Sequence, residues 1–500
     1  MAVALVLGAV ARSAAGTAPS FAAAKRYATG AQPFVLTLGD LNEDGKPDLV
    51  TGNLSSAVSV LLNRGHGSFE TWHSYKTDDD PASLAIADLN GDGKADLVSA
   101  SDMSDNVSVL LNRGDGSFAA RKDYETGSSP DQVAIADFNG DGAPDLTTNG
   151  LQSVSVLLNR GDGDFDAKRE YATGGSPSLA VTDLNSDGKL DLVTANASSK
   201  TVSVLLNRGD GGFEAKRDYA TGKVPSALAV ADLNADGKSD IVTANTASVS
   251  VLLNLGDGSL RTHREYANCA PCFPDTARSG SGTFAVVVAD LDGDGGPDLV
   301  TRNIDERRDG SSAGTVSVFL NKGGGTFKGQ HSYRTGRMYR VDSDAAWWLA
   351  VSDVNGDRKP DLANTNGVNG ISLLLNRGNG TFDSRLEYRT WRDRDDSASS
   401  AAIADLNDDG KPDVVAADSD ASRLSLLVNT PGLCNVQYVR GLTRARARAK
   451  LERVNCRLGR LRRVHSRMKR GLVLGTKPRF GTVGPGGKKI DLIVSSGPKR

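Results

Sequence analysis

Short runs of apolar and β-branched residues recur along most of the chain, and Gly, Asp and Asn separate them. One unit near the middle contains four such runs, at 178–182, 192–195, 201–206 and 213–221. Runs of this length that end at turn residues are typical of β-strands. Four antiparallel strands in each repeat unit predict the blade of a β-propeller.

An acidic loop connects the first two predicted strands of each unit. Its pattern is Asp-x-Asn-x-Asp-Gly-x-x-Asp or a near copy, and it recurs eight times at a spacing of roughly 50 residues, which indicates a repeat architecture. Oxygen ligands at positions 1, 3, 5 and 9, with Gly at position 6 for a sharp turn, match the first part of an EF-hand calcium loop. The predicted calcium ligands are Asp40, Asn42, Asp44, Asp48, Asp88, Asn90, Asp92, Asp96, Asp137, Asn139, Asp141, Asp145, Asp183, Asn185, Asp187, Asp191, Asp232, Asn234, Asp236, Asp240, Asp290, Asp292, Asp294, Asp298, Asp353, Asn355, Asp357, Asp361, Asp405, Asn407, Asp409 and Asp413.

We expect up to eight calcium ions with a structural role, because the carboxylates of each loop repel one another without a cation. The ion would also replace core that the blades lack, since the chain has only 13 Phe and 4 Trp. A calcium-bridged ligand site is the alternative role. Two loops depart from the pattern: Asp292 replaces Asn and keeps an oxygen ligand, whereas Arg358 replaces the turn Gly and makes the seventh loop the weakest match.

Each unit reads Asp-Leu-Asn-x-Asp-Gly-x-x-Asp-Leu-Val and then Val-Ser-Val-Leu-Leu-Asn-x-Gly-Asp-Gly-x-Phe, with small departures. This pattern resembles the FG-GAP/VCBS repeats, which are related to the propeller of integrin alpha chains, and the resemblance covers residues 21–429. It implies an all-β, eight-bladed propeller. A lone outer-type strand at 21–30 precedes the first unit, and the last unit stops after its third strand at 424–428. Their pairing would close the ring, whereas an open solenoid would leave two sheet edges.

The charge of the chain is divided between two modules. Residues 431–500 hold 19 Lys and Arg against 2 Asp and Glu, so the net charge of −2 combines a tail of +17 with a remainder of −19. Such a division indicates modules with different partners. The tail predicts an anionic partner, and wall polymers, anionic glycans and nucleic acid all satisfy the electrostatics.

The tail also carries a recognisable spacing of residues, with Gln437 as a departure from it. The matching residues are Gly441, Leu442, Thr443, Ala447, Leu451, Cys456, Arg457, Leu458, Gly459, Lys469, Arg470, Gly471, Pro478, Gly481, Thr482, Val483, Gly487 and the final run 490–497. This spacing resembles a PASTA domain, a module of bacterial cell-wall kinases and penicillin-binding proteins. The resemblance implies a small α+β domain at 434–500, after a linker at 430–433, and peptidoglycan or another anionic wall polymer as partner.

The four cysteines fall into two pairs. Cys434 and Cys456 bracket the predicted helix of the tail and could pair in an oxidising compartment. Cys269 and Cys272 could form a local disulfide in a propeller loop. A thioredoxin-like pair or a zinc site of four cysteines is weaker, because 269–272 does not lie at a strand-to-helix junction.

The first 20 residues resemble the apolar and small-residue regions of a secretory signal, although no Lys or Arg precedes the apolar run. We therefore expect a secreted, cell-wall-associated protein, and wall polymer is favoured over nucleic acid as the partner of the tail. No other stretch approaches the 18 apolar residues of a membrane span.

Irregular segments interrupt the pattern in units 6 to 8, on the face opposite the acidic loops. Irregular loops on a rigid scaffold commonly carry binding residues, and aromatic rings beside Arg suit a glycan or a protein ligand. Drift of surface loops is the alternative explanation. The candidate ligand-binding residues are Tyr339, Arg340, Trp347, Trp348, Trp391 and Arg392.

No catalytic motif stands out, and the five His residues are scattered among different units. We predict a monomeric, non-enzymatic binding or adhesion protein held at the wall by its C-terminal module. A structural surface protein without a ligand is one alternative. A polysaccharide lyase is the other, by analogy with lyases that use calcium-rich eight-bladed propellers.

Overall fold

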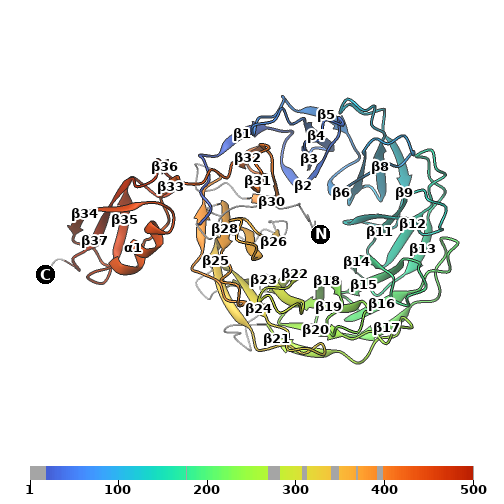
Figure 1. Ribbon diagram of the computed structural model, residues 1–500. Coiled ribbons are helices and arrows are strands. Elements are labelled where there is room, and N and C mark those ends of the chain that lie inside the picture. The colour runs from blue at the N-terminus through green and yellow to red at the C-terminus, as the bar shows by residue number, and fades with distance from the viewer. Residues whose placement is uncertain are drawn as a thin grey trace.

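The computed structural model describes residues 18–175, 177–268, 282–306, 312–338, 348–366, 370–390 and 398–498. Within these ranges the chain forms eight four-stranded antiparallel sheets that surround a central channel, followed by a small C-terminal domain (Figure 1). The prediction of an all-β fold built from eight repeated sheets is therefore confirmed. We call the sheets blades 1 to 8 and give each from its inner to its outer strand.

Blade 1 consists of β2 (Pro33–Gly39), β3 (Asp48–Asn53), β4 (Ala57–Leu61) and β5 (His73–Lys76). Blade 2 consists of β6 (Pro81–Ala87), β7 (Asp96–Ser101), β8 (Asn106–Leu110) and β9 (Lys122–Glu125). Blade 3 consists of β10 (Val133–Ala136), β11 (Asp145–Asn149), β12 (Ser153–Leu157) and β13 (Arg169–Ala172). Blade 4 consists of β14 (Pro177–Thr182), β15 (Asp191–Asn196), β16 (Thr201–Leu205) and β17 (Arg217–Ala220).

Blade 5 consists of β18 (Pro225–Ala231), β19 (Asp240–Asn245), β20 (Ser248–Leu252) and β21 (Arg264–Ala267). Blade 6 consists of β22 (Gly282–Ala289), β23 (Asp298–Glu306), β24 (Ser312–Phe319) and β25 (His331–Met338). Blade 7 consists of β26 (Leu349–Ser352), β27 (Asp361–Asn366), β28 (Gly370–Leu374) and β29 (Leu386–Tyr388). Blade 8 consists of β30 (Ala398–Ala404), β31 (Asp413–Asp418), β32 (Arg423–Leu427) and β1 (Lys25–Ala28).

The core lies between the blades rather than at the centre of the ring. Val50 and Val58 of blade 1 pack in one cluster with Leu84 and Leu97 of blade 2, and comparable clusters join other neighbouring blades. The two middle strands of a blade are therefore covered on both faces, which is why they read as continuous apolar runs. Outer strands such as β9 are mostly exposed and carry charged residues.

Blade 8 takes its outer strand from the other end of the chain. β1 pairs antiparallel with β32, and Lys25 lies opposite Leu426. Phe21 forms a bridge with Asn429, the same bridge that Asn63 forms with Phe69 inside blade 1. Segments that are more than 400 residues apart in sequence thus complete one repeat unit, in which Phe21 occupies the place that Phe69 holds in blade 1.

The C-terminal domain places one helix against a small sheet. It consists of β33 (Cys434–Asn435), α1 (Arg444–Glu452), β34 (Arg457–Val464), β35 (Val473–Lys477), β36 (Val483–Gly484) and β37 (Lys489–Ser495). β37 lies between β34 and β35, and β33 pairs with β36. The hydroxyl of Thr443 accepts a hydrogen bond from the Arg446 N–H and caps the start of α1, as hydroxyl side chains commonly do.

The predicted disulfide between Cys434 and Cys456 is confirmed, with an S–S distance of 2.09 Å. Cys269 and Cys272 lie outside the described residues, so their pairing stays a prediction. Among the helices in the described part of the chain, none has the length and apolar character needed to cross a membrane.

The C-terminal domain is packed directly against blade 7. Leu386 and Tyr388 of β29 share one buried cluster with Val436 and Leu451 of the domain. The Glu387 N–H donates a hydrogen bond of 2.8 Å to Oε1 of Gln437, which departs from the PASTA pattern and here lies in the contact. Residues 430–433 are therefore a short connection between two parts that share a core.

The N-terminal residues 19–21 lie in the same junction. The Tyr388 hydroxyl donates to the Pro19 carbonyl at 2.5 Å, and Nδ2 of Asn435 donates to the Phe21 carbonyl at 2.6 Å. Oγ of Ser20 donates to the Leu433 carbonyl at 3.0 Å. Residues 19–21 and the start of the C-terminal domain thus meet at the seam between blade 7, blade 8 and that domain.

Candidate metal centres

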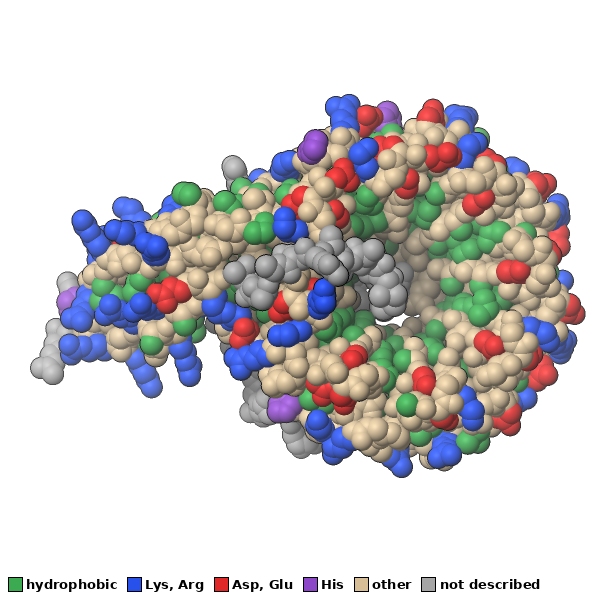
Figure 2. Space-filling view, in the orientation of Figure 1, with side chains coloured by type: hydrophobic (Ala, Val, Ile, Leu, Met, Phe, Trp, Pro, Cys, Tyr) green, Lys and Arg blue, Asp and Glu red, His purple; other side chains and the backbone are tan. Residues whose placement is uncertain are grey.

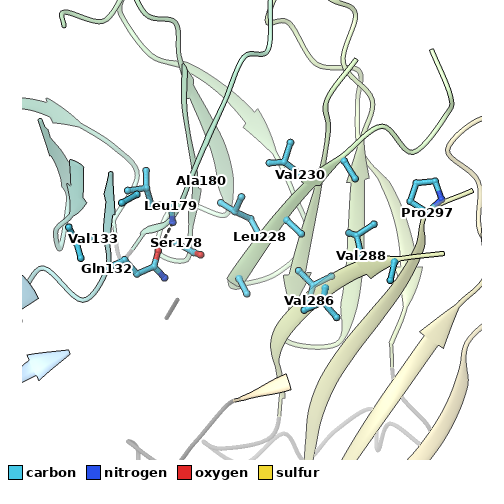
Figure 3. A pocket seen from close by; sticks show the side chains of 16 residues that line it. Gln132, Val133, Ser178, Leu179, Ala180, Leu228, Val230, Val286, Val288 and Pro297 are labelled. Atoms are coloured by element: carbon cyan, nitrogen blue, oxygen red, sulfur yellow. Dashed lines mark hydrogen bonds between the residues drawn. The ribbon is translucent and has the colours of Figure 1, made fainter. Parts of the chain in front are cut away.

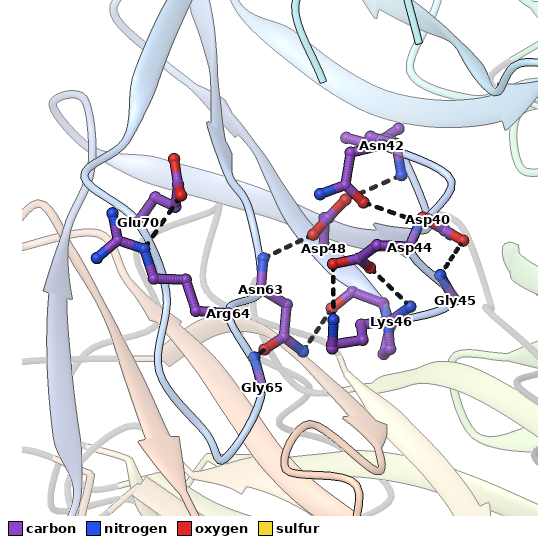
Figure 4. A network of polar contacts seen from close by, with 12 residues as sticks. Asp40, Asn42, Asp44, Gly45, Lys46, Asp48, Asn63, Arg64, Gly65 and Glu70 are labelled. Atoms are coloured by element: carbon purple, nitrogen blue, oxygen red, sulfur yellow. Dashed lines mark hydrogen bonds and ion pairs between the residues drawn. The ribbon is translucent and has the colours of Figure 1, made fainter. Parts of the chain in front are cut away.

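The first acidic loop, 40–48, has the compact turn that its sequence predicts (Figure 4). Asp40 accepts backbone hydrogen bonds from Gly45 N at Oδ2 (2.8 Å) and from Asp44 N at Oδ1 (3.1 Å). Gly45 has a φ of +78°, a conformation in which glycine carries no Cβ penalty. The turn gathers the side-chain oxygens of Asp40, Asn42 and Asp44 at one exposed hairpin tip, where an oxygen-preferring cation could bind them together.

The ninth position of each loop has a second, structural task. Asp48 is fully buried, and its two carboxylate oxygens accept hydrogen bonds from Leu41 N (2.9 Å) and Asn63 N (2.6 Å). It therefore ties the acidic loop to the turn that follows β4. Burial raises the pKa of Asp48 to about 6, although the hydrogen bonds from Asn63 and Leu41 oppose that rise.

A lysine at the seventh position supplies a positive charge in six of the eight loops. Nζ of Lys46 lies 2.8 Å from Oδ2 of Asp44, which lowers the pKa of that carboxyl group. The same pair occurs in other loops as Lys94–Asp92, Lys189–Asp187, Lys238–Asp236, Lys359–Asp357 and Lys411–Asp409. Loops 3 and 6 have Ala143 and Gly296 at this position instead.

The sixth loop brings three carboxylates close together. Asp290, Asp292 and Asp294 offer carboxylate oxygens that all lie within 4.8 Å of one another. Oδ1 of Asp292 is buried and has no hydrogen-bond partner, and burial together with the nearby Asp294 raises the pKa of Asp292. An orphaned buried oxygen beside two further carboxylates is the donor set that a divalent cation needs.

The seventh loop turns in the same way as the others. Arg358 adopts a left-handed conformation with a φ of +67°, and its N–H donates to Oδ2 of Asp353 at 2.6 Å, as the glycine N–H does elsewhere. The substitution is therefore accommodated by backbone strain rather than by a different turn.

One group of linking residues was missed by the sequence analysis. Nδ2 of Asn63, in the turn after β4 of blade 1, donates to the Leu406 carbonyl in the acidic loop of blade 8 at 3.3 Å. The same link joins each later blade to the loop of the blade before it, through Asn112, Asn159, Asn207, Asn254, Asn321, Asn376 and Asn429. The signal was the Asn that follows the apolar run of the third strand in every unit, which the sequence analysis gave only as part of the repeat pattern.

The predicted ligand-binding residues fall almost entirely outside the described chain. Tyr339, Arg340, Trp347, Trp391 and Arg392 belong to that group, so the prediction of a shared site stays open. Trp348 is described, is partly buried and packs against the cluster that joins blade 7 to the C-terminal domain.

A cavity of about 580 Å³ lies in the central channel, on the side of blades 3 to 6 (Figure 3). Its wall is formed by the inner strands and is almost entirely aliphatic, with residues such as Val133, Leu179, Leu228 and Val286. The green interior of the ring in Figure 2 shows the same apolar character. Gln132 and Ser178 are the polar side chains among the described lining residues, which include no Asp, Glu, His, Lys, Arg or Cys.

Comparisons with solved structures returned proteins of low sequence identity. A lectin of Agrocybe aegerita that recognises non-reducing terminal N-acetylglucosamine is 24% identical, with a TM-score of 0.42 over 60% of this chain and 80% of its own. A biofilm matrix protein of V. cholerae is 13% identical, with a TM-score of 0.43 over 83% of this chain and 92% of its own. A periplasmic gluconolactonase of Pseudomonas aeruginosa is 16% identical, with a TM-score of 0.43 over 71% of this chain and 95% of its own. None of these similarities is high enough to carry an argument about function.

A comparison with curated protein sequences found no match. The model of the FG-GAP-like repeat, in contrast, matches at residues 40–99, 88–148, 137–194, 183–243, 232–301 and 353–416, which together cover more than half of the chain. The matched stretches begin at the acidic loops described above. The chain therefore belongs to the FG-GAP-like repeat family.

Proposed function

We propose that this protein is a secreted propeller, stabilised by calcium and closed by its N-terminal strand, that binds a glycan or protein ligand. Its C-terminal domain, which resembles a PASTA domain, attaches it to an anionic polymer of the bacterial cell wall. The observation that carries the proposal is the packing of a strongly basic domain against an acidic ring through one shared core. Such packing holds the ring in a fixed orientation relative to whatever the basic domain binds.

Calcium is the cation that the acidic loops fit best, because all their donors are oxygens from carboxylate and amide groups. In each loop the ion would be held by the residues at positions 1, 3, 5 and 9, and it would neutralise their mutual repulsion. The orphaned oxygen of Asp292 supports loop 6 as the strongest of these sites.

The role of calcium is tested by thermal unfolding of the full chain with calcium and with chelator. We expect the chelator to lower the Tm, and Asp292→Asn to reduce the difference between the two conditions. Glu43→Gln is the matched control, since it removes an acidic charge from a position of loop 1 that is not a predicted ligand. A Tm that does not respond to calcium would contradict the proposed role.

Wall attachment is tested by sedimentation of the full-length protein with purified cell-wall sacculi, in calcium and in chelator. The full chain is used because the C-terminal domain shares its core with blade 7. Binding in both conditions is expected, since the basic domain carries no acidic loop. Absence of binding in both would exclude wall attachment.

The propeller ligand is sought with a glycan array on the same protein. Loss of the signal in Trp347→Ala, with the Tm unchanged, is the result expected of a lectin-like site on blades 6 to 8. Release of unsaturated sugar ends would instead identify a lyase.

A further inference from the structure

The sheet of the C-terminal domain has one face that packs on the core and one that faces solvent. Ile490, Leu492 and Val494 of β37 are buried and belong to the core cluster that includes Leu451 of α1. Residues alternate along a strand, so Lys489, Asp491 and Ile493 lie on the solvent face.

Four cations lie on that solvent face, and we call them the basic face: Arg457, Arg462, Lys477 and Lys489. Arg457 lies opposite Lys489 and Arg462 opposite Ile493 in the pairing of β34 with β37, while Lys477 of β35 lies opposite Asp491. All four side chains belong to exposed residues. The basic face thus extends across all three strands of the sheet.

These cations lack acidic partners within the described part of the chain, where none of the four forms an ion pair. The domain has two carboxylic side chains, of which only Asp491 lies on the solvent face, so the four cations there outnumber the acidic group. Glu452 pairs with Arg448 on α1 at 2.7 Å, and Oδ1 of Asp491 accepts a hydrogen bond from Arg460 N at 2.6 Å. The positive charge of the basic face is therefore available to an external anion.

The basic face is also open and carries no aromatic ring. A Cβ built on Gly475, which lies opposite Ile493 on β35, would meet no atom within 4 Å. Tyr438 and Phe480 instead pack on each other, with ring centroids 5.7 Å apart, and Arg389 of the propeller covers Phe480. Without rings for stacking, the face can recognise its partner through charge and hydrogen bonds only.

The orientation of the domain keeps this face accessible. Its opposite side contacts blade 7 through residues such as Gln437 and Arg453. β34 and β37 lie on the side of the domain away from the ring (Figure 1), and Lys and Arg side chains cover much of the domain surface in Figure 2.

We infer that the basic face binds a linear polymer that carries regularly spaced phosphate groups, as a deepening of the wall attachment proposed above. Neighbouring strands are about 5 Å apart and five residues of a strand span about 16 Å, so the four cations match several successive anions rather than one. Arginine presents a planar fork of donors that fits phosphate oxygens in pairs. Polymers of phosphodiesters supply such groups along their length.

The test measures binding of the full-length protein to fluorescently labelled long-chain inorganic polyphosphate by anisotropy at several salt concentrations. The double variant Arg462→Glu/Lys489→Glu should bind about tenfold or more weakly, with a smaller dependence on salt. Arg444→Glu/Arg446→Glu on α1 makes the same change of net charge at exposed positions away from the sheet and should retain most of the affinity. Hyaluronate, a polymer that carries carboxylates instead of phosphates, should bind more weakly than polyphosphate.

Gly475 offers a further variant that does not disturb packing. Gly475→Glu places a negative charge in the middle of the basic face and should weaken binding, whereas Gly475→Gln should not. Equal losses in the sheet and helix double variants, or equal binding of hyaluronate and polyphosphate, would overturn the inference. Sedimentation with sacculi that survives in Arg462→Glu/Lys489→Glu would overturn it while leaving wall attachment intact.

Discussion

The outer strands of blades 5 and 7 occupy equivalent places in the ring and have opposite surroundings. β21 (Arg264–Ala267) is largely exposed, with a cation at its first position. β29 (Leu386–Tyr388) is buried at every position, and Leu386 stands where β21 has Arg264. The other outer strands of the ring begin with Lys, His or Arg. One aliphatic residue in place of a cation thus marks the blade that receives the C-terminal domain.

The comparison shows how a repeat protein can attach a second domain without changing its repeat. Blade 7 keeps the strand pairing of its neighbours, and Tyr388 makes an edge-on ring contact with Phe21 at 4.7 Å, much as Tyr333 does with Phe382 at 5.4 Å. Blade 7 differs from the other blades in the C-terminal domain that covers its outer strand. The attachment therefore depends on a few side chains, and variants of those side chains test it.

The largest effect is expected from giving blade 7 the cation of its neighbours. Leu386→Arg would bury a charge in the shared core and should destabilise the docked domain by about 3–5 kcal/mol. The reverse change on blade 5, Arg264→Leu, should stay within about 0.5 kcal/mol because the position is exposed. Urea unfolding of both variants measures the difference, and similar values for the two would contradict the comparison.

Removal of the disulfide should have the second-largest effect on stability. It closes a loop of 22 residues within the docked domain, and its removal by Cys434→Ala/Cys456→Ala should cost about 3 kcal/mol. The outer strand of blade 7 should then become protease-sensitive, while that of blade 5 should not. Limited proteolysis followed by mass spectrometry locates the cuts. Equal cutting on both blades would mean that the C-terminal domain does not protect β29.

The third effect depends on pH, because Lys450 is buried in the contact. Burial lowers the pKa of Lys450 to about 8, while Glu387 of β29 opposes this shift. The unfolded chain then binds more protons than the folded chain between about pH 8 and the ordinary pKa of lysine, so stability rises with pH in that window. We expect a gain of about 1–2 kcal/mol from pH 7.5 to 9.5 in urea unfolding.

Lys450→Met is the control for that prediction, because it removes the titrating group and leaves a side chain of similar length. Its stability should show no comparable gain over the same pH range. An identical pH dependence in the variant would assign the effect to other groups.

The smallest effect is expected from the ion pairs at the edge of the contact. Arg453 of the C-terminal domain pairs with Asp383, which also pairs with Arg377 of its own blade at 2.8 Å. On blade 3 the corresponding exposed pair is Arg160–Asp166 at 2.8 Å. Arg453→Ala should cost about 1 kcal/mol and Arg160→Ala less than about 0.5 kcal/mol in thermal unfolding. A larger loss in Arg160→Ala would reverse the comparison.

Much of the fold followed from local sequence. The runs at 192–195 and 201–206 became β15 (Asp191–Asn196) and β16 (Thr201–Leu205) with small shifts at their ends. The run at 213–221 was too long, because Phe213 only bridges Asn207 and regular pairing begins at Arg217. The end of a strand depends on where a partner remains in register, and a run of apolar residues does not carry that information.

The contacts between distant segments were less accessible to sequence reasoning. The turn asparagines recur in every unit, but their position does not identify their partners, since the partner of Asn63 is 343 residues away. Leu386 identifies the blade that receives the C-terminal domain only when it is compared with the first residue of every other outer strand. The acidic loops were predictable because their geometry is local, whereas the second role of Asp48 depends on a turn 15 residues further along the chain.

The seam where residues 19–21 meet the start of the C-terminal domain has a consequence for the order of synthesis. Blade 8 needs β1, which emerges first from the ribosome, and β32, which emerges near the end. The ring therefore cannot be completed until β32 has been made, and the contact between Ser20 and Leu433, 413 residues apart, forms only after that. Until then the early blades expose an unpaired flank that could associate with another chain.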